Sequence, residues 1–140
     1  MKPSLYIACA ALAIAAAAPA QSMRPVDDTH CQISVPADWA DSKIAGIGAR
    51  STEDRRFNAV VRGFESGEYQ TVVDGMKQMK ATVVEENGSH VLMSADFPGG
   101  RKQYVEITKS KPLGCRVNIT FPPGKEPIAR KIADSVKPLK

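Results

Sequence analysis

The chain has 140 residues, of which 43% are hydrophobic and 24% are charged. This length allows one domain and hardly two, and the charged fraction is that of a folded protein rather than a disordered one. Lysine and arginine outnumber aspartate and glutamate by 19 to 15, which gives a net charge of +4. The composition of such a weakly basic chain excludes no class of anionic partner. The distribution of the charges along the chain is therefore needed to judge which partner it could bind.

The first twenty residues are typical of a secretory leader. Lys2 supplies a short positive start, residues 5–18 are apolar and rich in alanine, and Ala18-Pro19-Ala20 places small residues where a signal peptidase cleaves. The apolar run is about 14 residues, which is shorter than the roughly 20 that cross a bilayer. We therefore expect cleavage after Ala20, rather than a membrane anchor.

Cleavage there would divide the chain into three parts. Residues 1–20 would be removed, residues 21–29 are polar and are expected to form a flexible arm, and residues 30–140 are expected to form a single domain. Loss of Lys2 would lower the net charge to +3. The short, alanine-rich leader looks bacterial, so the expected location is the periplasm.

Two cysteines, Cys31 and Cys115, remain once the leader and Cys9 are removed. An even number of cysteines in an oxidising compartment favours a disulfide bond. A bond between them would close a loop of about 85 residues, worth roughly 4 kcal/mol in the chain-entropy model. Free buried thiols and a reactive cysteine are the alternatives, but the sequence has no C-x-x-C or other activating context. We expect a structural disulfide between them.

Alternating apolar residues predict strands, and two changes of period predict helices. Strands are expected at residues 31–35, 43–51, 56–64, 82–86, 89–95, 102–109 and 114–121, and helices at residues 68–81 and after Pro127. Tight turns such as Asn87-Gly88 make neighbouring strands antiparallel. The expected fold class is α+β, an antiparallel sheet with two helices in the order β-β-β-α-β-β-β-β-α.

This order, together with the segment ISVPADW at residues 33–39, resembles the PsbP-like fold. That fold is shared by extrinsic proteins of photosystem II and by DcrB-like bacterial envelope proteins. Its members often begin with a strand that runs into a Val-Pro-x-x-Trp type turn and end with a helix. The resemblance would cover residues 32–139. It implies a non-enzymatic accessory, chaperone-like or assembly role, and it supplies no shared catalytic residues.

The sequence has no recognisable catalytic or metal-binding pattern. It lacks the G-x-S-x-G and S-x-x-K nucleophile motifs, and the carboxylate pairs at residues 53–54 and 85–86 are not placed as an acid–base pair. The dense group of ligand-type side chains at residues 27–31 matches no common zinc spacing. We therefore expect no enzymatic activity, no metal and no cofactor.

Charge is divided unevenly along the chain. Residues 21–96 carry 8 basic and 12 acidic side chains, whereas residues 97–140 carry 10 and 3. The candidate basic patch consists of Arg101, Lys102, Lys109, Lys111, Arg130 and Lys131. Such a patch favours another protein with an acidic surface, or an anionic envelope lipid, as partner, and a periplasmic address argues against nucleic acid. A solvated basic face without a partner has the same composition.

The last two predicted strands also offer a polar face. If the apolar sides of both strands face one helix, their opposite sides present the candidate binding residues Tyr104, Glu106, Arg116 and Asn118. Tyrosine and arginine are frequent anchors of protein interfaces. A wet face of an antiparallel sheet would look similar in sequence.

Two functions therefore stay open. The first is a non-catalytic periplasmic binding or accessory protein of PsbP-like fold that acts through protein–protein contacts. The second is a periplasmic immunity protein or inhibitor that neutralises a secreted antibacterial toxin, a role that suits small disulfide-bonded domains without an active site.

Overall fold

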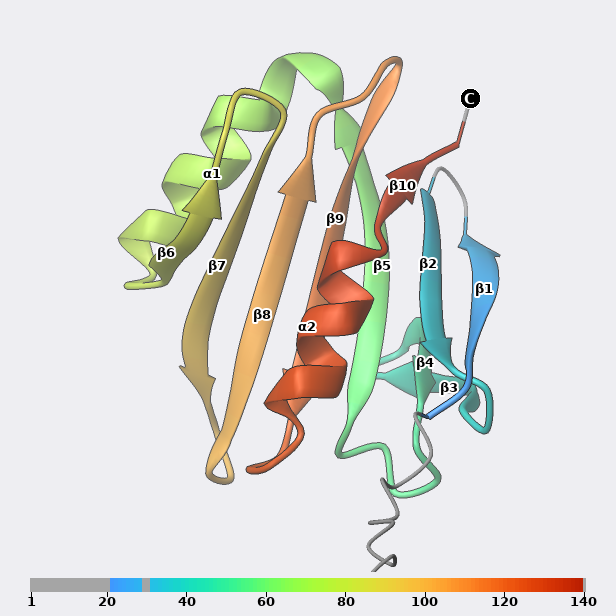
Figure 1. Ribbon diagram of the computed structural model, residues 1–140. Coiled ribbons are helices and arrows are strands. Elements are labelled where there is room, and N and C mark those ends of the chain that lie inside the picture. The colour runs from blue at the N-terminus through green and yellow to red at the C-terminus, as the bar shows by residue number, and fades with distance from the viewer. Residues whose placement is uncertain (1–20, 29–30, 140) are drawn as a thin grey trace, which may run out of the picture.

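The computed structural model describes residues 21–28 and 31–139 (Figure 1). The predicted leader lies outside these residues, as does part of the ligand-type group at residues 27–31. In chain order the elements are β1 (Met23–Asp28), β2 (Cys31–Pro36), β3 (Ala40–Ile44), β4 (Ile47–Ser51), β5 (Asn58–Glu65), a short 3-10 helix (Ser66–Glu68), α1 (Tyr69–Gln78), β6 (Thr82–Glu86), β7 (His90–Phe97), β8 (Arg101–Thr108), β9 (Leu113–Phe121), α2 (Glu126–Asp134) and β10 (Lys137–Pro138). No helix in this described part is long and apolar enough to cross a membrane.

The strands form two sheets in which all neighbours are antiparallel. The larger sheet has the order β3-β4-β5-β9-β8-β7-β6, and the smaller has the order β1-β2-β10. Figure 1 shows α2 in front of the larger sheet, with the smaller sheet beside it. The predicted α+β class, with its antiparallel sheet, two helices and order of elements, is confirmed.

The two faces of the larger sheet carry separate cores. On one face, Ala129 and Ile132 of α2 pack with Val117 and Ile119 of β9 and with residues of β2. On the other face, α1 packs against β7 and β8 through a second cluster that includes Val73. Because successive side chains of a strand point to opposite faces, β7 and β8 contribute apolar residues to both clusters.

The smaller sheet corrects one expectation about the first part of the chain. Residues 21–29 are predicted to be a flexible arm, but Met23–Asp28 pair along the whole of β2 as strand β1. Met23 and Val26 pack against the core on the α2 face. The polar residues and Pro25 that suggest a loose arm belong to an edge strand, where a missing N–H is tolerated.

The predicted strand at residues 43–51 is in fact a hairpin of β3 and β4. Ala45 and Gly46 form its turn with positive φ angles of 51° and 80°. A two-residue turn of this kind needs positive φ at both positions, and only Gly46 signals that in the sequence. The tip of this hairpin forms one wall of a cavity.

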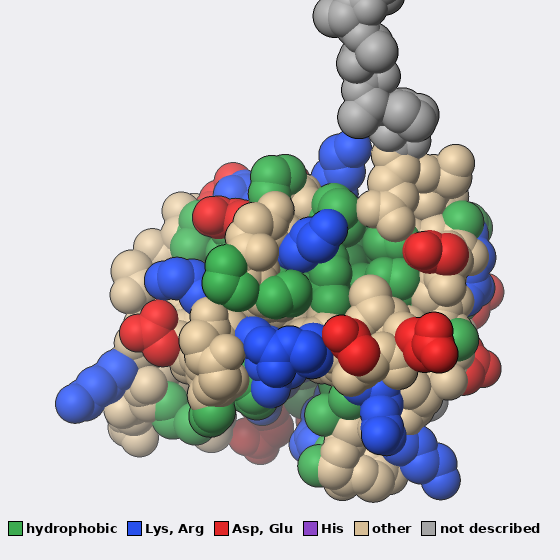
Figure 2. Space-filling model, turned by 90° about the horizontal axis from the view of Figure 1, so that it is seen from below, with side chains coloured by type: hydrophobic (Ala, Val, Ile, Leu, Met, Phe, Trp, Pro, Cys, Tyr) green, Lys and Arg blue, Asp and Glu red, His purple; other side chains and the backbone are tan. Residues whose placement is uncertain are grey.

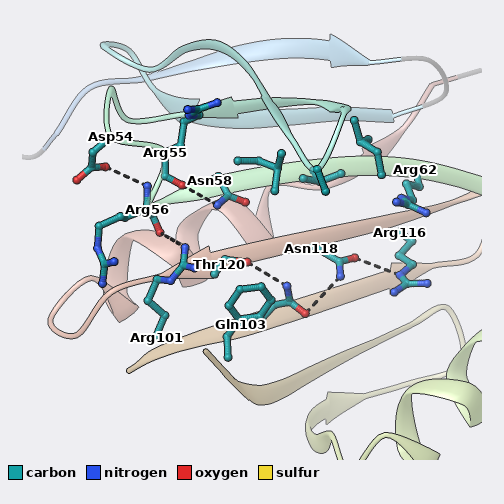
Figure 3. Close-up of a pocket in the computed structure, with 15 residues that line it drawn as sticks. Asp54, Arg55, Arg56, Asn58, Arg62, Arg101, Gln103, Arg116, Asn118 and Thr120 are labelled. Carbon is teal, nitrogen blue, oxygen red and sulfur yellow. Dashed lines mark hydrogen bonds between the residues drawn. The ribbon is translucent and has the colours of Figure 1, made fainter. Parts of the chain in front are cut away.

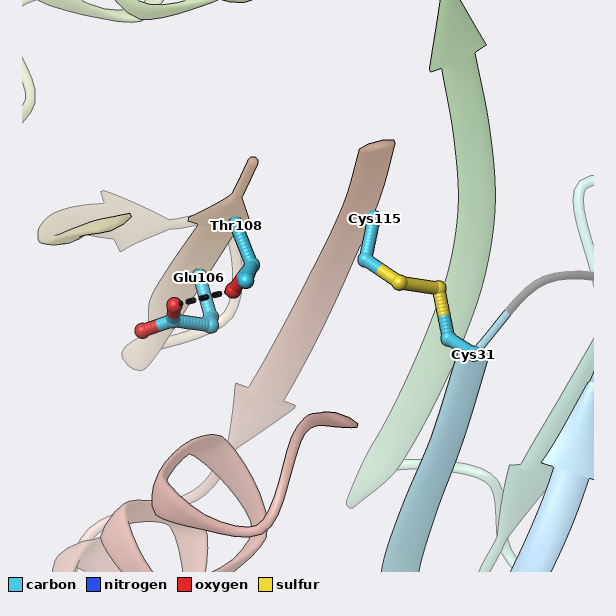
Figure 4. The surroundings of a disulfide bond; sticks show 4 residues. All are labelled: Cys31, Glu106, Thr108 and Cys115. Carbon is cyan, nitrogen blue, oxygen red and sulfur yellow. Dashed lines mark hydrogen bonds between the residues drawn. A yellow bond between two sulfur atoms is a disulfide. The ribbon is translucent and has the colours of Figure 1, made fainter. Parts of the chain in front are cut away.

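The predicted disulfide between Cys31 and Cys115 is confirmed (Figure 4). It joins β2 of the smaller sheet to β9, which lies between β5 and β8 in the larger sheet. Both cysteines are fully buried. The bond therefore ties the two sheets together through the core of the domain.

Candidate functional site

The residues predicted to form one binding face lie on opposite faces of the sheet. Tyr104 pairs directly with Ile119, and paired residues share a face, so Tyr104 and Glu106 lie on the face that α2 covers. Arg116 and Asn118 alternate with the buried residues of β9 and therefore point to the other face. The predicted four-residue face is wrong as a single surface.

The error comes from β8, which is apolar on both sides. Val105 and Ile107 pack with α1, whereas Val117 and Ile119 of β9 pack with α2. The prediction assumes that both strands turn their apolar sides to the same helix. A strand buried on both faces gives no sequence signal of which side meets which helix.

The six residues of the candidate basic patch do not form one surface either. Arg101 and Lys102 lie beside the β7–β8 turn, Lys109 and Lys111 follow the far end of β8, and Arg130 and Lys131 lie on α2. Eight residues of extended strand separate the first pair from the second by roughly 25 Å. Arg130 is also neutralised by ion pairs with Asp134 at 3.0 Å and Glu85 at 3.1 Å.

A cavity of about 430 Å³ lies on the face of the larger sheet that α2 does not cover. β5, β9 and β8 form its floor, and the β3–β4 hairpin and the β4–β5 loop form its walls (Figure 3). Only Arg50 and Ser51 of β4 pair with β5, so the rest of the hairpin is free to diverge from the sheet. The cavity lies in the resulting fork, and Met76 of α1 contacts Arg116 on the cavity floor.

Five arginines line this space, which we call the arginine cavity: Arg55, Arg56, Arg62, Arg101 and Arg116. Within the part of the chain that the structure describes, none of the five forms an ion pair. Asp54 is the carboxylate in the lining. Its Oδ1 accepts hydrogen bonds from the backbone N–H of Arg56 at 3.0 Å and from the Thr52 hydroxyl at 2.7 Å. These bonds lower the pKa of Asp54. The cavity therefore carries a marked excess of positive charge.

Arg62 and Arg116 form what we call the inner pair. They lie directly opposite each other on β5 and β9, and both side chains line the cavity. Arg116 is half-buried, and burial together with the charge of Arg62 lowers its pKa. Like charges at directly opposed sheet positions destabilise the pair of strands. The inner pair is thus an electrostatic cost that no carboxylate among the described residues offsets.

A chain of side-chain hydrogen bonds orders the cavity floor. Arg116 Nε donates to Asn118 Oδ1 at 3.1 Å, and Asn118 Nδ2 donates to Gln103 Oε1 at 3.3 Å. Gln103 Nε2 in turn donates to Thr120 Oγ1 at 3.0 Å. Figure 3 shows these side chains in a row along the floor, with the inner pair at one end. The row holds Arg116 in position without neutralising it.

The other end of the cavity holds the remaining arginines, which we call the outer group: Arg55, Arg56 and Arg101. The Arg101 guanidinium stacks on the ring of Phe97 at 5.0 Å and donates to the backbone oxygen of Arg56 at 3.2 Å. Arg56 Nη2 donates to the backbone oxygen of Gly99 at 3.4 Å. These contacts tie the β7–β8 turn to the β4–β5 loop at the cavity edge.

The arginine cavity also has an apolar side. Ile44 and Ile47 of the hairpin, Val60 of β5 and Phe97 contribute to its lining. A shallower hollow that includes Phe57 and Pro122 adjoins it, because both are lined by Asp54 and Arg56. Figure 2, seen from below, shows hydrophobic side chains gathered at the middle of the molecular surface with Lys and Arg side chains beside them.

Of the predicted site residues, the structure brings Arg101, Arg116 and Asn118 together in this cavity. No sequence pattern predicts Arg55, Arg56 and Arg62 as site residues, since they lie in the part of the chain with excess negative charge. One usable signal was present. Arg116 lies between the buried residues Cys115 and Val117 in β9, which is an unfavourable position for an arginine without a carboxylate partner.

Glu106 belongs to a separate polar cluster under the end of α2. Its carboxylate contacts His90 Nδ1 at 2.9 Å and accepts a hydrogen bond from the Thr108 hydroxyl at 2.6 Å. His90 Nε2 lies 3.1 Å from Glu85. Glu106 is only 4% exposed, and burial raises its pKa.

This cluster resembles part of a hydrolase site, in which a carboxylate orients a histidine. The ring nitrogen that would act on a substrate is occupied by Glu85, however. Ser89 lines the same pocket, but its hydroxyl donates to Asn87 at 2.9 Å. Among the described residues, no three His, Cys, Asp or Glu side chains are placed to hold a metal ion. The cluster links β6, β7 and β8 through His90, and the ion pair between Glu85 and Arg130 joins it to α2.

Comparison with known proteins bears on the fold of the chain. No family model matches the sequence, and no curated protein sequence matches it significantly. Among solved structures, the chain is similar to cyanobacterial PsbP (CyanoP) from Synechocystis sp. PCC 6803, with a TM-score of 0.55 and 13% identity over 94% of this chain and 97% of that one. The chain thus has a PsbP-like fold, as the sequence predicted.

A second solved structure, from Bacteroides thetaiotaomicron VPI-5482, is similar with a TM-score of 0.57 and 16% identity. The match covers 79% of this chain and 45% of that one, so this chain spans less than half of the longer protein. At these identities the likeness concerns the fold alone.

Proposed function

We propose that the protein is a non-catalytic accessory protein of the bacterial periplasm that binds an acidic segment of another protein in the arginine cavity. The observation that carries this proposal is the set of five guanidinium groups around one cavity, with no ion pair to any of them among the described residues. Guanidinium groups bind carboxylates through paired, charge-assisted hydrogen bonds.

The size and shape of the arginine cavity favour a protein segment over a lipid surface. Its volume of about 430 Å³ lies at the lower end of the range for ligand pockets. It is a concave space between the hairpin and the sheet, which suits a few side chains of a protein segment better than a flat membrane surface. The apolar side formed by Ile44, Ile47 and Val60 suits aliphatic side chains beside the acidic ones.

The periplasmic location is supported by the leader-like residues 1–20 and by the buried disulfide, since such bonds persist in oxidising compartments. The PsbP-like fold supports an accessory role, and kinship with DcrB-like envelope proteins is part of the same proposal. The absence of an activating context for any nucleophile in the sequence supports a role without catalysis.

Affinity capture from a periplasmic extract tests the proposal when it is run with matched variants. The cavity variant Arg56→Gln with Arg101→Gln removes two charges from the outer group. The control variant Lys77→Gln with Lys131→Gln removes two exposed charges from α1 and α2. We expect a partner with an acidic segment to be recovered at equal stoichiometry by the wild type and the control and to be lost with the cavity variant.

Recovery of the same partner by the cavity variant would contradict the proposed site. If the partner is a secreted toxin whose activity stops on binding, the result supports the inhibitor function and contradicts the accessory one.

A further inference from the structure

We infer that the inner pair, Arg62 and Arg116, is a clamp for one carboxylate that is carried next to an apolar side chain. This inference rests on the proposed function, because it takes the arginine cavity as the binding site and names the chemical group that enters it. It concerns one end of the cavity only, so it can fail while the outer group still binds a partner.

The first observation is the placement of the two guanidinium groups. Arg62 and Arg116 are directly paired across β5 and β9. Side chains at such positions start about 4.5–5.5 Å apart at their Cβ atoms. Two planar guanidinium groups at this spacing can approach the two oxygens of a single carboxylate from opposite sides. Bound there, the carboxylate would replace the repulsion between the two cations with two attractions.

The second observation is that Arg116 is held in place from behind. Its Nε donates to Asn118, and its Nη2 lies 3.6 Å from the sulfur of Met76 on α1. Asn118 is fixed by Gln103, which is fixed by Thr120. A guanidinium that is already positioned loses little conformational freedom on binding, which favours affinity. Arg62 has an exposed side chain and no such hydrogen bonds among the described residues, so it keeps more conformational freedom than Arg116.

The third observation is the chemistry of the neighbouring surface. Val60 lies two residues before Arg62 on the same strand face, and Ile44 and Ile47 line the same cavity. These side chains carry no hydrogen-bond donors, so a carboxylate attached to an aliphatic group is better matched than a bare phosphate ion. They also give contact area to an aliphatic side chain next to the carboxylate. The ligand group is therefore a chain-terminal carboxylate with an aliphatic last residue, or an acidic side chain beside an aliphatic one.

The experiment is a calorimetric titration with small probes at constant ionic strength. Acetyl-Ala-Leu with a free carboxylate represents the chain terminus, and acetyl-Leu-Glu-amide represents the acidic side chain. Acetyl-Ala-Leu-amide is the neutral control, and inorganic phosphate is the competing anion. We expect one of the two carboxylates to bind and the neutral probe not to bind. The carboxylate that binds identifies the source.

The variants locate the binding. Arg62→Gln and Arg116→Gln should each weaken the carboxylate by about 10- to 100-fold, since each removes a hydrogen bond to a charged group. Lys77→Gln, which removes an equal charge from the exposed side of α1 outside the cavity, should change the affinity less than threefold. Arg62→Glu should abolish carboxylate binding and also raise the unfolding temperature, because the new side chain pairs with Arg116. That gain shows that the lost binding is not a failure to fold.

Three results would overturn the inference. These are an affinity for the neutral amide equal to that for the tighter-binding carboxylate, tighter binding of phosphate than of either carboxylate, and no effect of Arg62→Gln on the carboxylate that binds. If Arg62→Gln also leaves capture of the acidic partner intact while Arg56→Gln with Arg101→Gln removes it, the clamp is wrong and the proposed function stands. If neither substitution affects the partner, the proposed function fails as well.

Discussion

Arg62 on β5 and Arg116 on β9 face each other as directly paired residues of the larger sheet, and neither forms an ion pair with any described residue. Burial and the charge of Arg62 both lower the pKa of Arg116, so its positive charge is less well stabilised there than in water. A sheet position that costs stability and lines a cavity is typical of a binding site.

The inner pair predicts an unusual effect of removing a charge. Arg62→Gln should increase the free energy of unfolding by about 0.2–1 kcal/mol at low salt, because it removes a repulsion between directly opposed residues. The gain should shrink in high salt, which screens exposed charges. Urea unfolding at two salt concentrations checks this, with Arg55→Gln as the control. A loss of stability that is the same at both concentrations would argue against repulsion within the pair.

The disulfide predicts a large loss of stability when it is removed. Replacing both Cys31 and Cys115 with alanine should lower the free energy of unfolding by roughly 4 kcal/mol. The reason is that the unfolded chain of the variant lacks the cross-link, which in the wild type restricts its conformational freedom. Urea titration of the variant measures this loss. Reduction of the wild type should produce a similar loss and leave the variant unchanged. A loss below about 1 kcal/mol would show that the bond is not structural.

Two glycines predict opposite effects of the same substitution. A Cβ at Gly114 of β9 would overlap the ring of Phe64, whereas a Cβ at Gly75 of α1 meets nothing within 4 Å. Gly114→Ala should therefore cost about 1–3 kcal/mol through overpacking. Gly75→Ala should add up to about 1 kcal/mol, since alanine favours a helix more than glycine does. Thermal unfolding of the two variants checks the pair. A similar shift in both would contradict the packing of Phe64 over Gly114.

The buried Glu106 predicts a specific dependence on pH. Burial raises the pKa of Glu106 in the folded state above its unfolded value, so folding favours the protonated form. The stability that it contributes is full below the unfolded pKa and is lost as the pH rises toward the folded pKa. The free energy of unfolding of the wild type minus that of Glu106→Gln should fall over this window, which begins near pH 4. Chemical unfolding from pH 4 to 8 measures this difference. A difference that stays constant or increases with pH would mean that the contacts to His90 and Thr108 outweigh burial.

Local patterns in the sequence predict much of this fold. Alternating residues mark β7, β8 and β9, the spacing of Ile128 and Ile132 marks α2, and the even number of mature cysteines marks the disulfide. These features depend on neighbours in sequence. The β3–β4 turn escapes because it places Ala45 at a positive φ of 51°, which alanine seldom adopts.

The site was less predictable because it depends on pairing between distant strands. Arg62 and Arg116 are brought together by the register of β5 and β9, which no short motif encodes. The prediction places Tyr104 on the wrong face of the sheet. Its neighbours Val105 and Ile107 on β8 pack with α1, whereas the apolar residues of β9 pack with α2. The total charge was also a poor guide, since three of the five cavity arginines lie in the acidic part of the chain.

The most direct test of the arginine cavity is a titration followed by NMR of the arginine Nε–Hε groups. The probe is a short peptide of alternating glutamate and leucine, with a lysine–leucine peptide as the control. Arg24, which donates to the Trp39 backbone oxygen, and Arg130, which is ion-paired, report from outside the cavity. We expect saturable shifts of Arg56, Arg62, Arg101 and Arg116 with the acidic peptide only. Equal shifts at Arg24 and Arg130, or no saturable shift in the cavity, would contradict this expectation.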